Sequence, residues 1–370
     1  MKTIRRYLYA EVLTAVGFVT LGFLALFFFF DFVDELRWLG GQYQLTQALG
    51  FVTLSLPSHL YELLPITVLI GTIFVMARLA QSSEYTILRT SGLGPWRALR
   101  TLLMLGAAFV VLTFAVGDYL APASDRAAAL LKARYQGRIT LGTSGAWMKE
   151  RQGPENYMVN VGSLSADGGM RNVRIFEFDT RGFLHSFTMA PTARVAPDGE
   201  SWLLADAQRS LFHEGTDSAR PGERPRVEHT RVPEFTWPTR ISAEMVSAAL
   251  LKPERMSTID LFQYIRHLGA NGQSAQRYEI AFWRKVFYPL SCLVMVVLAL
   301  PFAYLHFRSG GITTYVFGGV MAGISFFLLN NVFGYIGNLQ NLSPWLAAGA
   351  PGIIYSLLSL GAFGWLVLRR

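Results

Sequence analysis

Long stretches without charged residues dominate both ends of the chain. Three stretches near the N-terminus share an uninterrupted uncharged core: residues 12–30, 51–77 and 98–120. A fourth covers residues 286–305, and residues 310–368 contain no Asp, Glu, Lys, Arg or His and have one turn-rich break at 337–344. A helix crosses the bilayer with about 20 mostly apolar residues. The pattern therefore predicts six transmembrane helices, three on each side of a different middle segment.

The middle segment, residues 122–276, alternates apolar and polar positions between Gly and Pro turns. Such alternation is typical of half-buried strands, and it is clearest at residues 157–161, 173–178 and 202–206. We predict an antiparallel β sandwich with helical ends at residues 127–135 and 257–268. Three parts follow from this division: residues 1–121, 122–276 and 277–370.

The composition fits a membrane protein, because 52% of the residues are hydrophobic and only 16% are charged, against roughly 25% in soluble domains. Lys and Arg collect on one side of the predicted helices, at positions 2, 5, 6, 78, 89, 97, 100, 308, 369 and 370. The short loops of the other side hold only Arg37. Since cytoplasmic loops carry the excess of basic residues, both termini are expected in the cytoplasm. By parity the middle segment is expected on the outer side, which in a two-membrane bacterium is the periplasm.

The sequence lacks the motifs of several enzyme classes. It has no Gly-x-x-x-x-Gly-Lys phosphate loop, no His-Glu-x-x-His, and Cys292 is its only cysteine. We therefore expect no catalytic site, metal or cofactor, and any ATP would have to bind to another chain. No nucleic-acid motif is present, so the net charge of +8 is attributed to loops facing anionic lipid headgroups.

A short helix is predicted in the cytoplasmic connection at residues 81–92. Ser82 or Ser83 could cap its N-terminus, Glu84 would lie in its first turn, and Gly92 could end it in a left-handed conformation. Exposing its apolar residues Tyr85, Ile87 and Leu88 to water would be unfavourable, which favours docking of the helix into a groove of a partner. The alternative is a helix that lies on the lipid headgroups.

Residues 79–92, Leu-Ala-Gln-Ser-Ser-Glu-Tyr-Thr-Ile-Leu-Arg-Thr-Ser-Gly, resemble the coupling helix of the lipopolysaccharide export permeases, the LptF/LptG family. Further strings agree in order: Phe32-Val-Asp34, Leu64-Pro65, Gly117-Asp-Tyr-Leu-Ala-Pro122, and Trp283-x-Lys285-x-x-x-Pro289-Leu290 after Tyr278. The match covers both membrane halves at motif level and the middle segment by length and strand character. Within the family, the strings at residues 79–84 and 283–290 resemble the LptG branch more than the LptF branch.

The resemblance implies an ABC-type exporter without enzymatic activity in this chain. Its permease pairs with a paralogous LptF-like permease above an LptB-like ATPase dimer. Lipopolysaccharide then passes from the membrane through periplasmic β-jellyroll domains to an LptC-like bridge protein. The residues implied in ATPase coupling are Ser83, Glu84, Tyr85, Ile87, Leu88, Arg89 and Gly92.

The acyl chains and phosphates of such a substrate call for an apolar wall beneath a basic rim. Candidates for the rim are Arg37, Lys132, Arg134 and Arg138, and those for the wall and its gate are Phe30, Phe326, Phe327 and Asn330. Each has an ordinary alternative, since such Arg residues often anchor headgroups and Phe-rich faces often meet lipid. Asp31 departs from the family pattern, which has Lys there.

Two polar residues of the second predicted span, His59 and Glu62, lie about one helical turn apart. A hydrogen bond between them is the expected arrangement, and a proton relay is the alternative. Three other functions remain open from the sequence: the LptF-like partner subunit, a membrane-anchored scaffold that transports nothing, and an intramembrane enzyme using these two residues.

Overall fold

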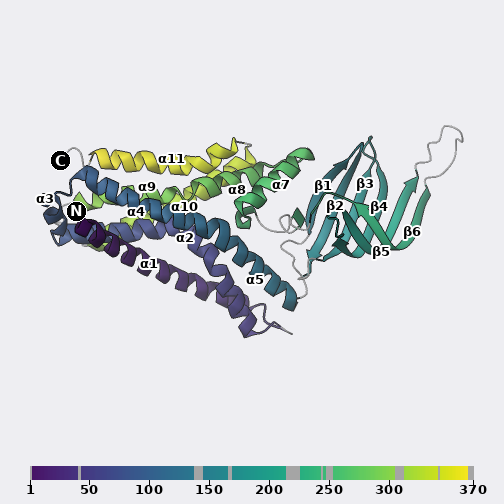
Figure 1. Ribbon diagram of the computed structural model, residues 1–370, viewed down its shortest axis with the longest axis horizontal. Coiled ribbons are helices and arrows are strands. Elements are labelled where there is room, and N and C mark those ends of the chain that lie inside the picture. Colours follow the sequence, from purple (N-terminus) through teal and green to yellow (C-terminus); the bar gives the residue numbers. More distant parts are fainter. Residues whose placement is uncertain are drawn as a thin grey trace. The chain divides into compact units, whose positions relative to one another are not determined.

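The computed structural model of the chain describes residues 2–40, 43–136, 145–165, 169–213, 226–242, 245–246, 253–304, 312–340 and 342–365 (Figure 1). The chain forms two compact units. The helical unit comprises Met1–Arg37, Val52–Asp125 and Gln276–Arg370, and the β unit comprises Trp38–Phe51 and Arg126–Ala275. Of the basic residues used to predict orientation, Arg308, Arg369 and Arg370 lie outside the described residues.

The first half of the helical unit is built from long helices joined by short connections. Helix α1 covers Lys2–Leu36, α2 covers Leu45–Gln81, the short α3 covers Glu84–Thr90, and α4 covers Pro95–Ala115. A π-helical turn, η1 (Val116–Leu120), continues α4 into α5 (Ala121–Gln136) without a break.

The second half contains α8 (Gln276–Phe287), α9 (Ser291–Ala299), the 3-10 turn η3 (Leu300–Tyr304), α10 (Ile312–Leu339) and α11 (Pro344–Phe363). Over the described part of the chain, five helices are long and apolar enough to span a membrane. The pair α8 and α9–η3 makes a sixth if it counts as one span bent by 46°. Pro289 lies in this break and lacks the N–H that a continuous helix would use. The fourth predicted span is therefore bent rather than straight.

Helix α2 forms the centre of the helical unit, because most of its apolar stretch is buried, whereas that of α1 is largely exposed. Gly71 allows the close approach of α1: a methyl group at its Cα would lie 2.7 Å from Val16 Cγ2 and 2.8 Å from Val16 Cα. Helix α4 packs against α9, and α11 packs against α8, α9 and α10 (Figure 1). The exposed apolar side chains around this bundle are typical of a surface that meets lipid.

The β unit contains a sheet of six described strands: β1 (Ala146–Gln152), β2 (Glu155–Leu164), β3 (Met170–Phe178), β4 (Leu184–Val195), β5 (Ser201–His213) and β6 (Arg226–Pro238). Every strand pairs antiparallel with its neighbour in sequence, in the order β1 to β6 (Figure 1). The predicted inserted antiparallel β domain is confirmed. Instead of the two sheets of a sandwich, the described strands form one hydrogen-bonded sheet, because alternation identifies a buried face but not which strands pair.

The alternation of buried and exposed side chains shifts by one residue along a line that crosses the strands. Asn172 in β3 and Asp206 in β5 have positive φ values of 52° and 53°, and both lie at the level of Pro191 in β4. On one side of this line the buried positions of β3 include Val173, whereas Met170 is buried on the other, with two exposed residues between them. The pairing itself continues in register across this line, since Arg171 pairs with Thr192 and Val173 with Ala190.

The described residues of the β unit also include η2 (Pro253–Arg255) and α7 (Thr258–Ala270). Ser257 and Asp260 form a capping box at the start of α7, as the predicted helix with a Ser or Thr cap requires. At the other end of α7, Asn271 Oδ1 accepts a hydrogen bond from the Arg151 N–H of β1 (2.8 Å). The helix is thus joined to the first edge of the sheet.

Candidate functional site

The short helix α3 packs on one side against the end of the fourth span. Tyr85 is only 2% exposed, and its ring packs edge-on against Tyr304 of η3 with centroids 5.2 Å apart. The guanidinium of Arg89 lies 5.1 Å from the centre of the same Tyr304 ring. Burial raises the pKa of the Tyr85 hydroxyl, so the residue is neutral at ordinary pH.

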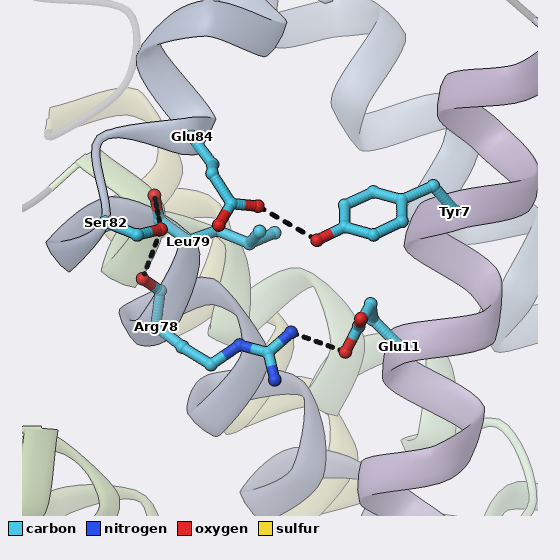
Figure 2. A network of polar contacts seen from close by, with 6 residues as sticks. All are labelled: Tyr7, Glu11, Arg78, Leu79, Ser82 and Glu84. Atoms are coloured by element: carbon cyan, nitrogen blue, oxygen red, sulfur yellow. Dashed lines mark hydrogen bonds and ion pairs between the residues drawn. The ribbon is translucent and has the colours of Figure 1, made fainter.

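A second connection joins α3 to the first span. The Tyr7 hydroxyl of α1 donates a hydrogen bond to Glu84 Oε2 (2.9 Å), and Figure 2 shows the two side chains pointing toward each other. One turn farther along α1, Glu11 forms an ion pair with Arg78 of α2 (2.5 Å). Polar contacts therefore link the first helix to both sides of the α2–α3 connection.

The serines before α3 act differently from the predicted cap. Ser83 is the N-cap residue, but its φ of 60° is left-handed and its side chain makes no capping hydrogen bond. Ser82 Oγ instead donates back to the Arg78 carbonyl at the end of α2 (3.1 Å; Figure 2). The capping prediction is wrong because the left-handed backbone of Ser83 differs from the extended backbone of an N-cap residue and Ser82 bonds back to α2. The left-handed conformation predicted for Gly92 is present, with φ 101°.

The apolar residues of α3 divide between two faces. Tyr85 and Leu88, three positions apart, both pack against the core of the helical unit, whereas Ile87 is 63% exposed. The interpretation that all three apolar residues meet a partner is therefore corrected. Only Ile87 is exposed, and it lies with exposed Thr86 and Thr90 on the face of α3 that points away from the helical unit.

Arg37 is exposed at the other end of α1, where it pairs with Asp34 (3.5 Å). Asp31, one turn earlier, lies 2.6 Å from His59 Nε2 of α2. His59 thus has a partner other than the predicted Glu62. Asp31, which replaces the Lys of the family pattern, binds an imidazole instead of adding a cation to the rim.

Lys132 and Arg134 belong to the part of α5 that lies in the β unit. The Lys132 ammonium lies over two aromatic rings, 4.6 Å from the centre of Phe51 and 5.5 Å from that of Trp38. Arg134 is exposed. The fourth rim candidate, Arg138, lies outside the described residues.

The candidates for the apolar wall fall into two groups. Phe30 is 57% exposed and Phe327 is also exposed. Phe326 is 2% exposed and packs against Tyr355, and Asn330, four residues along the same face of α10, is buried with it. The Asn330 carbonyl accepts a hydrogen bond from Arg284 Nη2 (2.8 Å). Phe326 and Asn330 therefore lie in the interior of the helical unit and not on its surface.

The model of one protein family, lipopolysaccharide export system permease LptF/LptG, matches residues 6–369. The chain belongs to this family. The match supports the resemblance carried by residues 79–92 and extends it through the β unit, which the motifs alone did not cover.

Individual members of the LptF/LptG family resemble the chain along its whole length. The lipopolysaccharide export system permease protein LptG of Escherichia coli (strain K12) is 27% identical over 368 residues, covering 99% of this chain and 98% of the relative. LptG of Haemophilus influenzae is 26% identical over 373 residues, covering 100% and 99%. The predicted similarity to the LptG branch is confirmed. Like these permeases, the chain is a lipopolysaccharide export permease, a transport subunit with several membrane-spanning helices.

One contact of this LptF/LptG permease was not foreseen. The Lys285 ammonium donates a hydrogen bond to the Gly117 carbonyl (2.8 Å), which joins two strings that carried the resemblance without a role. The sequence signal was a Lys next to a long apolar stretch, where an unpaired charge is costly. Across the described ranges, no three His, Cys, Asp or Glu side chains are grouped to hold a metal ion.

Proposed function

We propose that the chain is the subunit of an ATP-driven exporter in which α3 docks into a groove of an LptB-like ATPase dimer. The proposal rests on the two faces of α3. Its inner face contacts α1 through Glu84 and η3 through Tyr85, and its outer face exposes Ile87. A surface helix that only rests on lipid has no need of such internal connections.

Force on α3 would divide along two routes. The Tyr7–Glu84 hydrogen bond leads to α1, and the contact of Tyr85 with Tyr304 leads to the fourth span. Because the helix has only seven residues and both connections start in its first turn, it would move as a rigid piece. Closure of the ATPase would then reach two spans at once.

The remaining partners and the orientation follow the family. The chain would pair with an LptF-like permease, and residues 122–276 would form a periplasmic domain that passes lipopolysaccharide to an LptC-like bridge. The basic residues near the N-terminus and in the α3 connection support cytoplasmic termini. Residues 1–121 and 277–370 would together form the half of the membrane cavity contributed by this chain.

Lipopolysaccharide would meet a basic rim and an apolar wall. Arg37 and Arg134 offer exposed guanidinium groups that suit phosphate, and Phe30 and Phe327 offer exposed rings that suit acyl chains. Lys132 would serve as a cation held over two rings. Phe326 and Asn330 would act from the interior, by holding α10 in place behind the wall.

Photocrosslinking from position 87 tests the docking of α3. A photoreactive amino acid in place of Ile87, in cells with the complete exporter, should capture a soluble nucleotide-binding subunit. The matched control is position 88, whose side chain faces the core of the helical unit and should yield only crosslinks within the chain. Crosslinks from position 87 to lipid alone would place α3 on the membrane surface and overturn the proposal in favour of a scaffold.

A further inference from the structure

A buried cation links the two halves of the helical unit. Lys285 of α8 is 7% exposed, and its Nζ donates to the carbonyl of Gly117 in η1, 168 residues earlier in the chain. The two residues flank the inserted β domain, one before it and one after it. A charged side chain among apolar helices is costly and is expected to serve a function.

The sequence around η1 explains why this carbonyl is available. In an α-helix the Gly117 carbonyl would accept from the N–H of Ala121, but in the π turn that N–H is bonded to the carbonyl of Val116. The next N–H would come from position 122, which is Pro and has none. The helix therefore leaves an acceptor open inside the bundle, and the Lys285 ammonium fills it.

The same turn is held from a third helix. A methyl group on Gly117 would lie 2.3 Å from the Tyr61 ring of α2, so the ring rests directly on the backbone of η1. Tyr61 also packs against Tyr288, with ring centroids 5.2 Å apart, in the bend after α8. Only Gly permits this approach, and η1, α2 and α8 meet at one joint.

The neighbouring cation makes a different connection. Arg284 donates to the Asn330 carbonyl of α10, and a methyl group on Gly334 would overlap the guanidinium. Two consecutive residues of α8 thus bind backbone carbonyls on two different elements. The Arg284 bond joins α8 to the hairpin of the last two spans, and the Lys285 bond joins it to the span before the β domain.

We propose that Lys285 is a positioning residue for transport: by holding the open carbonyl of η1, it makes the third and fourth spans move as one piece. An ammonium bonded to a carbonyl in an apolar surrounding is stronger than a neutral hydrogen bond, so the joint persists while other helix contacts change. This inference rests on the proposed ATP-driven export. It adds that the two spans flanking the β domain are rigidly coupled.

For the test, the exporter is purified by an affinity tag on this chain and reconstituted in lipid vesicles that contain lipopolysaccharide. ATP hydrolysis and lipopolysaccharide release are then measured on the same sample. Lys285→Met keeps the length and apolar stem but loses the donor. It should lower the lipopolysaccharide released per ATP hydrolysed about tenfold, the factor expected when a charged hydrogen bond is lost. ATP hydrolysis should continue, because α3 and its contacts are untouched.

Three further variants separate positioning from stability. Lys285→Arg should restore most of the coupling because a guanidinium can also donate to the carbonyl. Gly117→Ala should reproduce the loss from the other side of the joint. Arg284→Met, the matched control, removes the adjacent half-buried cation and should leave the ratio close to that of the unaltered exporter.

Several outcomes would overturn the inference. An unchanged ratio in Lys285→Met would do so, as would a parallel fall of hydrolysis and release, which indicates lost assembly, or an equal loss of coupling in Arg284→Met. Failure of the unaltered exporter to release lipopolysaccharide with ATP would instead contradict the proposed function itself.

Discussion

At the scale of single residues, Glu84 is the side chain through which α3 reaches α1. Glu84→Ala removes the acceptor for the Tyr7 hydroxyl, and Tyr7→Phe removes the donor. Each should reduce lipopolysaccharide export several-fold while membrane insertion stays normal. Because this hydrogen bond is exposed, we assign it about 1 kcal/mol, which corresponds to a roughly fivefold effect.

The double variant decides whether these residues act together. If force passes through the hydrogen bond, Tyr7→Phe with Glu84→Ala should export about as well as Glu84→Ala alone, because the second change removes nothing more. Glu84→Gln is the control that keeps an acceptor oxygen for Tyr7. Losses that simply multiply would mean that each residue works through some other contact.

At the scale of helices, the packing of α1 on α2 depends on Gly71. Gly71→Ala would place a methyl group 2.8 Å from the Val16 backbone, so the helices must separate. We expect a loss of about 1 to 3 kcal/mol in stability, seen as a lower melting temperature in detergent. Gly22→Ala is the matched control on α1, where no atom lies within 4 Å. Equal melting of the two variants would refute close packing at Gly71.

His267 of α7 makes the stability of the β unit depend on pH. Burial lowers the pKa of His267 below its ordinary value, although the carboxylate of Glu150 opposes the shift. The unfolded chain therefore binds the proton first as the pH falls through about 6.5, and stability present above this value is lost below it. The β unit of the full chain should melt at a lower temperature at pH 5.5 than at pH 7.5.

The variant His267→Gln, which cannot be charged, should lose most of this pH dependence between the two conditions. Melting can be followed by tryptophan fluorescence, because Trp202 and Trp237 lie in the sheet core and their rings contact each other at 5.4 Å. The same pH dependence in His267→Gln would assign the effect to other groups.

At the scale of the whole molecule, the path of lipopolysaccharide should be sensitive to charge on α5. Arg134→Glu reverses an exposed charge without breaking a packing contact, so it should weaken crosslinking of lipopolysaccharide to this chain at least about threefold. Lys132→Glu should have a larger effect because the contacts with Phe51 and Trp38 are lost as well. Arg151→Glu, an exposed position on β1, is the control, and unchanged crosslinking in Arg134→Glu would remove that residue from the site.

The sequence was a good guide to which segments cross the membrane and a weaker guide to which way their side chains face. The uncharged stretches predicted the spans, but Tyr85 was expected to face a partner and packs inside, and His59 binds Asp31 rather than Glu62. On α10, Phe326 and Phe327 are neighbours in sequence, yet one is buried and the other exposed. A helix apolar on all sides carries no periodic signal to tell these faces apart.

The sequence by itself determined the membrane spans, the inserted β domain, the short helix before Gly92 and the family, because these depend on local composition, period and motif. Only the tertiary structure decided the contacts that connect them. Tyr7 and Glu84 are 77 positions apart, and Gly117 and Lys285 are 168 apart. No local pattern encodes such pairs, since each is fixed by how whole helices pack and by which polar groups that packing leaves to be satisfied.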